Sequence, residues 1–464
     1  MKIAGNDILI QSLINEGVEY IFGYPGGAAL HIYDSIFNQK EMQHILVRHE
    51  QGATHAADGY ARATGKPGVV LVTSGPGATN AITGIATAFM DSIPMVIISG
   101  QVQSHLIGTD AFQETDMIGV SRPIVKHSFT VDKQENIANI VAEAFHIATS
   151  GRQGPVLIDV PKDLTNPDDL FDFVYPDKVH VRSYNPPIKP ENHQVSRAVD
   201  AILASERPVI YAGGGTISSN ASKELRELND LIDAPVTNTL MGLGVFPGTH
   251  KRFLGMLGMH GTYQANMAMH NADLIIALGA RFDDRITNAP DKFAPRAKVI
   301  HFDVDHSSVS KIIEADIAVF GQIKDSLQAI NNHLKTKIDE IDNEKLAPWH
   351  QQISDWKEKH GLNHDLYKIE DDSGPILPQA AVQHIYQESQ GKAFVTSDVG
   401  QHQMFAAQYY HFDEPRKWIN SGGLGTMGFG LPSAMGVKLA YPDEEVICIT
   451  GEGSIQMCIQ ELST

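Results

Sequence analysis

The chain has 464 residues, with 36 lysines and arginines against 55 aspartates and glutamates, and a formal net charge of −19. This acidic balance argues against nonspecific binding to nucleic acids or anionic lipids, because both require a basic protein surface. The length is enough for about three domains. Two cysteines cannot build a disulfide framework or a cysteine metal site, which fits a reducing compartment.

The first residues predict an amphipathic helix and no targeting segment. Ile8, Leu9 and Leu13 lie on one helical face, and Asn6 or Asp7 is expected to cap the helix. No apolar run approaches the roughly 18 residues that cross a bilayer. We therefore expect no membrane and no nucleic-acid partner, and a cytoplasmic location in a bacterial cell, since no leader precedes the first domain.

Strand-like and helix-like segments alternate along the chain, which predicts α/β layers with parallel sheets. In the first third we expect strands at residues 20–22, 45–48, 69–73, 95–99 and 156–159. Helices are expected at residues 51–64, 78–90 and 135–149. Prolines at both ends of residues 161–190 and between them then indicate a linker.

The same alternation continues to the last residue. The middle third predicts helices at 194–204 and 322–341, and strands at 209–212, 274–278, 299–303 and 317–320. Residues 371–378 indicate a second boundary. The last third predicts helices at 380–388, 402–410 and 427–440, and strands at 394–397, 417–420 and 446–450. The chain ends within an expected helix, so we expect a truncated third domain.

Three glycine-rich turns follow expected strands and precede expected helices, at residues 74–77, 213–216 and 451–454. Backbone N–H groups at a helix N-terminus favour anions such as pyrophosphate. For any one turn, a plain connection from strand to helix is the more common explanation. None of the turns matches the dinucleotide fingerprint with its distant acid, and none is a P-loop.

Two polar features are ambiguous when taken alone. Glu50 lies between an expected strand and an expected helix, where a lone carboxylate is more often solvated than catalytic. The run RFDDR at 281–285 follows a buried strand, and it indicates either a ligand-binding edge or a surface ion-pair cluster. The 21 histidines include no H-E-x-x-H pattern, so a zinc site is not indicated.

The motifs in their order are far more specific than each motif alone. They include FGYPGGA at 22–28, VRHEQGATHAADGYARATG at 47–65, SGPGATNAITGIATAFMDSIP at 74–94, DAFQETD at 110–116, GMLGMHGTYQAN at 255–266, GARFDDR at 279–285, INSGGLGTMGFGLP at 419–432 and TGEGSIQMCIQELST at 450–464. Together they closely resemble the large, catalytic subunits of the acetolactate synthase family, which are thiamine-diphosphate enzymes. The resemblance extends over essentially the whole chain.

The resemblance implies an α/β fold of three doubly wound parallel-sheet domains. Residues 1–165 would form a pyrimidine-binding domain, 190–345 an FAD-binding domain, and 375–464 an incomplete diphosphate-binding domain. The active site would lie between two subunits of a homodimer or tetramer. One subunit would supply Glu50, and the other the turn at 451–454.

The implied reaction is that of acetolactate synthase, with thiamine diphosphate, Mg²⁺ and FAD as cofactors. Pyruvate is decarboxylated, and the hydroxyethyl carbanion condenses with a second pyruvate or with 2-oxobutyrate. The products, 2-acetolactate or 2-aceto-2-hydroxybutyrate, lead to valine, leucine and isoleucine. A small regulatory subunit is the expected partner. The alternatives are an enzyme similar to pyruvate oxidase, which uses FAD as an electron acceptor, and an inactive FAD-binding fragment.

Five positions match catalytic residues of the family. Glu50 would exchange a proton with N1′ of the aminopyrimidine, and a carboxylate in a dry site has the raised pKa that suits this role. Phe112 and Gln113 would lie beside the reaction centre, and Lys126 would line the substrate entrance. Arg285 would meet the carboxylate of the second substrate, because a guanidinium binds a planar carboxylate well.

A larger set matches cofactor contacts of the family. The contacts to thiamine diphosphate would come from Pro25, Gly26, Gly27, Val399, Gly400, Gln401, His402, Gly425, Met427, Gly451, Glu452, Gly453 and Ser454. The contacts to FAD would come from Arg152, Gly213, Gly214, Gly215, Thr239, Leu240, Met241, Leu257, Gly258, Met259, His260, Gly279, Arg281, Asp283, Arg285, Asp303 and Val304.

The chain departs from the family pattern at three places. Glu452 replaces the aspartate that binds Mg²⁺, and its extra methylene must be accommodated in a strict octahedral geometry. We expect Glu452 to bind the metal in a shifted rotamer. Gln322 replaces an aspartate near the FAD. The asparagine that completes the metal site, and a methionine and tryptophan of the acceptor pocket, are absent from the chain.

Overall fold

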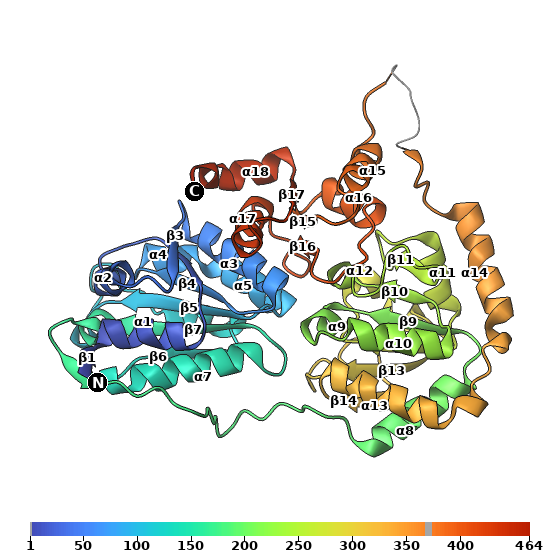
Figure 1. Cartoon of the computed structure of the whole chain (residues 1–464), viewed down its shortest axis with the longest axis horizontal. Helices are drawn as coiled ribbons and strands as arrows, with labels where there is room; N and C mark the ends of the chain where they lie inside the picture. Colours follow the sequence, from blue (N-terminus) through green and yellow to red (C-terminus); the bar gives the residue numbers. More distant parts are fainter. Residues whose placement is uncertain (1, 367–373) are drawn as a thin grey trace. The chain divides into compact units, whose positions relative to one another are not determined.

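The computed structural model describes residues 2–366 and 374–464, which form two compact units (Figure 1). The first unit contains Met1–Asn185, Val395–Val399 and Ile419–Thr464. The second unit contains Pro186–Phe394 and Gly400–Trp418. The boundary expected at 371–378 lies partly outside the described residues. Parallel sheets with helices confirm the predicted α/β class.

Six parallel strands form the main sheet of the first unit, in the order β3-β2-β4-β5-β7-β6. Their bounds are β2 (Tyr20–Gly23), β3 (Gln43–Leu46), β4 (Gly68–Val72), β5 (Met95–Gln101), β6 (His127–Thr130) and β7 (Pro155–Pro161). Every residue of β4, β5 and β7 is buried. These strands therefore form from continuous apolar runs, as expected where helices cover both faces of a sheet.

Helices cover the two faces of this sheet through alternate strand residues. Val69 and Leu71 of β4 face the core formed with α1 (Gly5–Asn15), α2 (Leu30–Asn38) and α7 (Ile137–Thr149). Val70 and Val72 face the opposite core, formed with α3 (Glu50–Thr64), α4 (Pro76–Asn80) and α5 (Ile82–Asp91). The period of two along the strand thus separates the cores. A short helix, α6 (Met117–Ser121), precedes β6.

Two expectations for this unit are wrong. The N-cap of α1 is Ala4, without a side-chain bond. Tertiary contacts occupy the expected caps, because Asn6 donates to the carbonyl of His31 and Asp7 accepts from Ser35. Residues 161–190 are more than a linker, since β8 (Leu170–Asp172) pairs antiparallel with β1 (Lys2–Ala4).

The sheet of the second unit has six parallel strands in the order β11-β10-β9-β12-β13-β14. The strands are β9 (Pro208–Ala212), β10 (Val236–Asn238), β11 (Phe253–Met256), β12 (Leu274–Leu278), β13 (Lys298–Asp303) and β14 (Ile317–Phe320). One face is covered by α8 (Asn192–Ala204), α10 (Ser222–Ile232) and α13 (Ile323–Thr336). The other is covered by α11 (Tyr263–Asn271) and α14 (Ala347–His360).

Short helices complete the second unit. They are α9 (Gly214–Ser218), α12 (Asp284–Thr287), α15 (Pro378–Glu388) and α16 (Gln401–Tyr409). The helix expected at 322–341 ends earlier, at Thr336. Within the described residues, none of the helices combines the length and apolar character needed to cross a membrane.

A third sheet contains β16 (Trp418–Asn420), β15 (Phe394–Ser397) and β17 (Val446–Ile449), in that order. In the first unit, α17 (Gly430–Ala440) packs closely against α3. A Cβ atom at Gly59 would lie 2.2 Å from the carbonyl oxygen of Ser433, so only glycine allows this approach. The expected helix start at residue 427 is wrong. Gly428 has a φ of +85°, which a helix does not tolerate, and α17 begins at Gly430.

Candidate functional site

The strand order of the first unit predicts where a ligand would bind. Strand β2 lies between β3 and β4, so successive strands are added on opposite sides of β2, and the strand order reverses there. Open α/β sheets bind ligands outside the carboxyl ends of their strands at such a point. The loops that leave β2, β3 and β4 here are residues 24–29, 47–49 and 73–75. They contain the predicted Pro25, Gly26 and Gly27, and they lead into Glu50.

The turn after β2 rests directly on the loop after β4. A Cβ atom at Gly26 would lie 2.4 Å from Cγ2 of Thr73, so this position requires glycine. The backbone N–H of Ala28 donates to Oγ1 of Thr73 at 3.2 Å. A Cβ atom at Gly27 would meet no atom within 4 Å. The turn is therefore fixed on one side and open on the other, as a ligand-facing turn must be.

Glu50 is the first residue of α3 and is 9% exposed. Its Oε2 accepts from Nδ2 of Asn80 at 3.0 Å. Its Oε1 lies 3.2 Å from the place where a side chain at Gly77 would begin. A carboxylate in the first turn is favoured by the helix dipole. Asn80 was not predicted from the sequence, although it lies one helical turn after the SGPG turn.

Gln113 lies next to the same glycine-rich turn. A Cβ atom at Gly75 would be 2.9 Å from both Cβ and the carbonyl oxygen of Gln113. Gln113 has a φ of +61°, an unfavourable conformation for a residue with a side chain. Phe112 is 88% exposed. The structure thus brings Gln113 close to the Glu50 region and leaves Phe112 at the surface of the chain.

Lys126 has a different environment. Its ammonium donates to the carbonyl of Ser150 at 2.8 Å and to the hydroxyl of Tyr184 at 2.8 Å, and it also contacts the carbonyl of Ile147. These carbonyls lie at the C-terminal end of α7, where a cation satisfies free carbonyl groups. The predicted place of Lys126 at a substrate entrance stays a prediction.

Several predicted contacts to thiamine diphosphate meet in the later part of the first unit. Gly425 has a φ of +72°, and a Cβ atom there would lie 3.9 Å from Cγ1 of Val399. A Cβ atom at Gly453 would lie 3.2 Å from Cε of Met427. The turn at 451–454 leads into α18 (Glu452–Cys458). These segments therefore form one surface.

Ser454 tests whether this surface fits a diphosphate. Its hydroxyl is buried, and it has no hydrogen-bond partner among the described residues. A buried hydroxyl without a partner is costly, so it suggests a missing acceptor. The hydroxyl lies in the first turn of α18, where backbone N–H groups also favour an anion. The residues present fit a diphosphate group.

The metal site is less complete. Glu452 is exposed in the first turn of α18 and offers one carboxylate. Within residues 2–366 and 374–464, no group of three or more histidine, cysteine, aspartate or glutamate side chains could hold a metal ion. Glu452 fits one position of a Mg²⁺ shell, whose other positions oxygen atoms of a diphosphate and water can fill.

The Glu50 turn contacts the segment that follows α18. Both carboxylate oxygens of Glu461 accept from the backbone N–H of Arg48 at 3.1 Å. Glu461 is buried, and Nε of Arg48 donates to the hydroxyl of Ser463 at 2.8 Å. One chain therefore already places the pyrimidine side and the diphosphate side in contact. The predicted sharing of the site between two subunits stays a prediction.

The strand order of the second sheet also reverses, between β9 and β12. Counted from β9, its strands follow the order 3-2-1-4-5-6, which is that of dinucleotide-binding folds. The turns after β9 and β12 meet backbone to backbone. A Cβ atom at Gly213 would lie 2.4 Å from the carbonyl oxygen of Gly279, and one at Gly215 would lie 2.8 Å from its Cα. The edge between these strands is therefore bare backbone.

Most other predicted FAD contacts follow neighbouring strands at the same edge. They are Thr239, Leu240 and Met241 after β10, Leu257, Gly258, Met259 and His260 after β11, Arg281, Asp283 and Arg285 after β12, and Asp303 and Val304 at the end of β13. The hydroxyl of Thr239 is buried and has no partner among the described residues. Parallel strands thus gather segments that are far apart in sequence, and the site fits a dinucleotide.

The turn after β12, which contains Asp283 and Arg285, bonds to the segment that follows β11 and begins α12. The backbone N–H of Met259 donates to the carbonyl of Arg285 at 2.9 Å, which joins two predicted FAD segments. The carboxylate of Asp283 accepts from the N–H of Arg285 and caps α12. The side chain of Arg285 is 68% exposed and lies 3.8 Å from Asp284. It is therefore accessible to a ligand.

Four predicted contacts have other surroundings. Arg152 belongs to the first unit, where its Nε donates to the hydroxyl of Ser92 at 2.8 Å. Gly400, Gln401 and His402 belong to the second unit, although Val399 belongs to the first. The Nε2 atom of His402 is buried and has no hydrogen-bond partner among the described residues.

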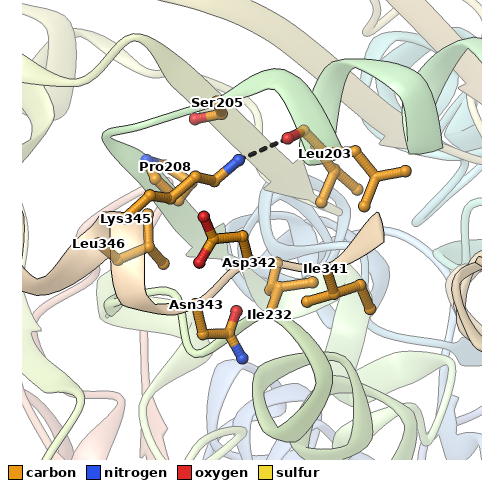
Figure 2. Close-up of a pocket in the computed structure, with 10 residues that line it drawn as sticks. Leu203, Ser205, Pro208, Ile232, Ile341, Asp342, Asn343, Lys345 and Leu346 are labelled. Atoms are coloured by element: carbon orange, nitrogen blue, oxygen red, sulfur yellow. Dashed lines mark hydrogen bonds between the residues drawn. The ribbon is translucent and has the colours of Figure 1, made fainter. Parts of the chain in front are cut away.

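A small cavity lies at the opposite end of the second sheet (Figure 2). It has a volume of about 20 Å³ and is lined by Ile202, Pro208, Ile341 and Lys345, among others. The ammonium of Lys345 reaches across it to the carbonyl of Leu203. The volume is enough for about one water molecule. This cavity is too small for either predicted cofactor.

Three family models match the chain in order. They are "Thiamine pyrophosphate enzyme, N-terminal TPP binding domain" at residues 3–120, the central domain at 195–330 and the C-terminal TPP binding domain at 398–464. An acetolactate synthase large subunit of Buchnera aphidicola from Acyrthosiphon pisum is 57% identical over 462 residues, covering 100% of this chain and 80% of the relative. The chain belongs to the acetolactate synthase large-subunit family.

Other members agree with this assignment. The large subunit of acetolactate synthase isozyme 3 of Escherichia coli is 54% identical, covering 100% of this chain and 80% of that protein. An acetolactate synthase of Mycobacterium bovis is 46% identical, covering 100% and 74%. The two thiamine-binding models match the segments that contain Glu50 and the 451–454 turn. The resemblance seen in the motifs is confirmed.

Proposed function

We propose that the chain is a catalytic subunit that forms 2-acetolactate or 2-aceto-2-hydroxybutyrate from 2-oxo acids. Pyruvate is the donor and loses CO₂, and pyruvate or 2-oxobutyrate is the acceptor. The observation that supports this most is the placement of Glu50. It is a buried carboxylate in the first turn of α3. Its Oε1 lies beside Gly77, and both Gly77 and the turn at Gly26 contact Thr73.

Thiamine diphosphate supplies a carbon nucleophile when it is bound. The chain's part is to hold and move a proton at the aminopyrimidine ring. Asn80 fixes Oε2 of Glu50 at 3.0 Å, which leaves Oε1 for the ring nitrogen N1′. A positioned carboxylate that exchanges a proton contributes about 10²–10⁴-fold to a rate. Gln113, held in its strained conformation beside Gly75, would line the reaction centre.

The other side of the cofactor would be held by the later part of the first unit. Backbone groups of Gly425 and Met427 would orient the aminopyrimidine. The hydroxyl of Ser454 and the N–H groups at the start of α18 would bind the diphosphate. Glu452 would give one oxygen to Mg²⁺. Val399, Gly400, Gln401 and His402 stay predicted diphosphate contacts.

FAD would bind at the carboxyl edge of the second sheet without a net redox role. The close approach of Gly213 and Gly215 to Gly279 leaves backbone without side chains where these turns meet, so a pyrophosphate can come close to the chain there, as in other dinucleotide sites. Arg285 is exposed at this edge and would meet the carboxylate of the acceptor. Arg152 stays a prediction of the resemblance.

The assembly and the location are also part of the proposal. A homodimer or tetramer is supported by the family resemblance, and a small regulatory subunit by the name "large subunit" of the relatives. Both cysteines, Cys448 and Cys458, are free, which suits the reducing bacterial cytoplasm. The domain boundaries 1–165, 190–345 and 375–464 stay proposals.

A direct assay tests the function. The purified protein is incubated with pyruvate, thiamine diphosphate, Mg²⁺ and FAD, and 2-acetolactate is measured. We expect product, with a flavin spectrum that stays oxidised under anaerobic conditions. Stoichiometric bleaching of the flavin by pyruvate would instead indicate a pyruvate oxidase. Bound flavin with no product would favour an inactive FAD-binding fragment.

Mixing two inactive variants tests the shared site. Glu50→Gln removes the proton carrier, and Glu452→Ala removes the metal carboxylate. If two subunits build each site, mixed dimers regain activity, because one of their two sites receives neither change. Each variant alone stays inactive. Mixed dimers without activity would show that each chain builds its own site, which the contact between Arg48 and Glu461 would then explain.

A further inference from the structure

Three buried charges join two helices of the first unit. Asp58 and Arg62 lie on α3, and Asp91 is the last residue of α5. The side chains of both aspartates are fully buried, and that of Arg62 is 5% exposed. Arg62 contacts the carboxylate of Asp58 through Nε and donates from Nη2 to Oδ2 of Asp91 at 2.9 Å.

Asp91 also binds a loop far away in the sequence. Its Oδ2 accepts from the backbone N–H of Gly422 at 3.0 Å, and its Oδ1 accepts from that of Gly423 at 2.7 Å. One carboxylate therefore links the guanidinium of Arg62 to two consecutive backbone amides. A Cβ atom at Gly423 would lie 2.9 Å from Oδ1 of Asp91, so this contact requires glycine.

The same loop is held at two further points. The hydroxyls of Thr87, on α5, and Thr426 form a buried hydrogen bond of 2.7 Å. The guanidinium of Arg62 lies 5.3 Å from the centre of the Phe429 ring. Residues 422–429 are thus fixed by α3 and α5 at their beginning, middle and end. Gly425 and Met427 lie between these points.

Such a cluster is unusual if stability is its purpose. Buried ion pairs are often no more stabilising than well-packed apolar residues of similar volume, because charges lose their hydration. Burial raises the pKa of Asp58, which reflects this cost. A charged cluster is better than apolar packing at fixing the orientation of the groups that it binds, since each charged hydrogen bond has a defined geometry. The bonds of Asp91 end on the backbone of the loop.

We infer that Arg62 and Asp91 are positioning residues that set the conformation of the 422–427 loop for thiamine diphosphate. Thr87 supports the same loop through Thr426. Neither charged residue contacts the cofactor, and both act through the backbone at Gly425 and Met427. The inference rests on the proposed function, because it assumes that these backbone groups orient the aminopyrimidine.

The test measures cofactor affinity by calorimetric titration of the full-length protein with thiamine diphosphate in the presence of Mg²⁺. Asp91→Asn keeps the shape but removes the charge that joins Arg62 to the loop. We expect its Kd to rise about tenfold or more, as for the loss of a charged hydrogen bond. The melting temperature and the flavin content are measured on the same samples.

Asp273→Asn is the matched control. Asp273 also accepts from two consecutive backbone amides, those of Glu206 and Arg207, at 2.8 and 3.0 Å. It lies in the second unit, one residue before β12, whereas the 422–427 loop belongs to the first unit. We expect this variant to lower the melting temperature and to leave the Kd unchanged. An equal Kd for Asp91→Asn and wild type would overturn the inference.

A second pair of variants covers the case in which Asp91→Asn does not fold. Thr87→Val keeps the volume and removes the hydroxyl that binds Thr426, whereas Thr87→Ser keeps the hydroxyl. We expect a Kd about threefold to tenfold higher for the valine variant and a wild-type Kd for the serine variant. Equal Kd values for both would overturn the inference. If wild type itself does not bind thiamine diphosphate, the proposed function fails, and the inference fails with it.

Discussion

The two six-stranded sheets share one architecture, but their carboxyl edges differ. At the first sheet, the edge brings together side chains: Glu50, Asn80, Thr73 and Gln113. At the second, the turns after β9 and β12 meet through backbone at Gly213, Gly215 and Gly279, and the Thr216 hydroxyl adds one bond to the carbonyl of Leu278. Backbone N–H groups can bind a pyrophosphate but cannot exchange a proton near neutral pH. Under the proposed function, one edge of this fold would serve the chemistry and the other would bind a cofactor.

Two buried glutamates make the comparison sharper. Glu50 and Glu224 each lie in the first turn of a helix. Each accepts from one side-chain amide, Asn80 at 3.0 Å and Gln328 at 2.9 Å. The free oxygen of Glu50 faces the glycine turns, whereas Oε2 of Glu224 is enclosed without a partner among the described residues. The two carboxylates are similarly buried and each has one amide donor. We therefore expect their different positions in the fold to decide which of them can take part in catalysis.

The largest expected effect comes from Glu50→Gln. The amide keeps the bond from Asn80 but cannot exchange a proton, so 2-acetolactate formation should fall by about 10²–10⁴-fold. Glu224→Gln is the matched control, and it should retain turnover within about twofold, because surface and structural changes of this size act mainly on stability. Similar losses in both variants would mean that the two edges do not differ in the way described.

The next effect tests the bare backbone of the second edge. Gly213→Ala places a Cβ atom 2.4 Å from the carbonyl oxygen of Gly279, so the unfolding free energy should fall by roughly 2–3 kcal/mol. Gly214→Ala is the control in the same turn, since its Cβ atom would approach no atom closer than 3.4 Å. Chemical denaturation measures both. Equal stability of the two variants would show that the turns are not closely packed.

A buried carboxylate of the first unit predicts a pH dependence. Burial raises the pKa of Asp159 to about 7, with Gln101 and Ser99 bonded to it and Asp116 nearby. The unfolded chain releases this proton near pH 4. The folded state therefore binds more protons between pH 4 and 7, so this group lowers stability as the pH rises through that range.

Asp159→Asn removes this titration. Relative to wild type, the variant should gain roughly 1–3 kcal/mol of unfolding free energy at pH 8. The gain should become smaller as the pH falls from about 7 to about 4, and it should vanish below that range, where both states of wild type carry the proton. Denaturant midpoints at pH 5 and pH 8 measure the difference. A gain that is constant with pH would mean that Asp159 is ionised in the folded protein.

The smallest effect concerns the strained Gln113. Glycine accepts a φ of +61° without cost, so Gln113→Gly should change stability by no more than about 1 kcal/mol, in the stabilising direction. Turnover should fall, because the side chain beside Gly75 is lost. Thermal melting and product formation are compared on one preparation. A variant that is less stable would show that contacts of the Gln113 side chain outweigh the strain of its backbone.

Long apolar runs were the most predictable part of the fold. The strands expected at 274–278 and 317–320 match β12 and β14 at both ends. Every residue of β12 is buried, as expected for a central strand that is covered on both faces. In β14, which lies at the edge of the sheet, buried and half-buried residues alternate. Element ends that depend on distant contacts were not predictable. The N-cap of α1 differs from the prediction because the side chains of Asn6 and Asp7 bond to His31 and Ser35.

Some residues of the candidate site could be predicted from the sequence and others could not. Glu50 and the glycine turns could be located from motifs, because strand order gathers them at one edge. Asn80 could not, since its bond to Glu50 depends on how α4 lies against α3. The bond from Gly423 to Asp91 joins residues that are 332 positions apart, and nothing local in the sequence indicates it. Residues that belong to motifs were therefore easier to identify from the sequence than the residues that hold them in place.

The pairing of β1 with β8 affects how the first unit is connected. Residues 2–4 form an antiparallel pair with residues 170–172, so the two ends of this long stretch meet. The backbone hydrogen bonds of this strand pair therefore hold together the beginning and the end of residues 2–172. A circular permutant, joined near this pair and opened at the exposed Asp132 and Lys133, would keep every parallel pairing of the six-stranded sheet. A segment whose two ends lie close together can also be inserted into another protein as a single domain.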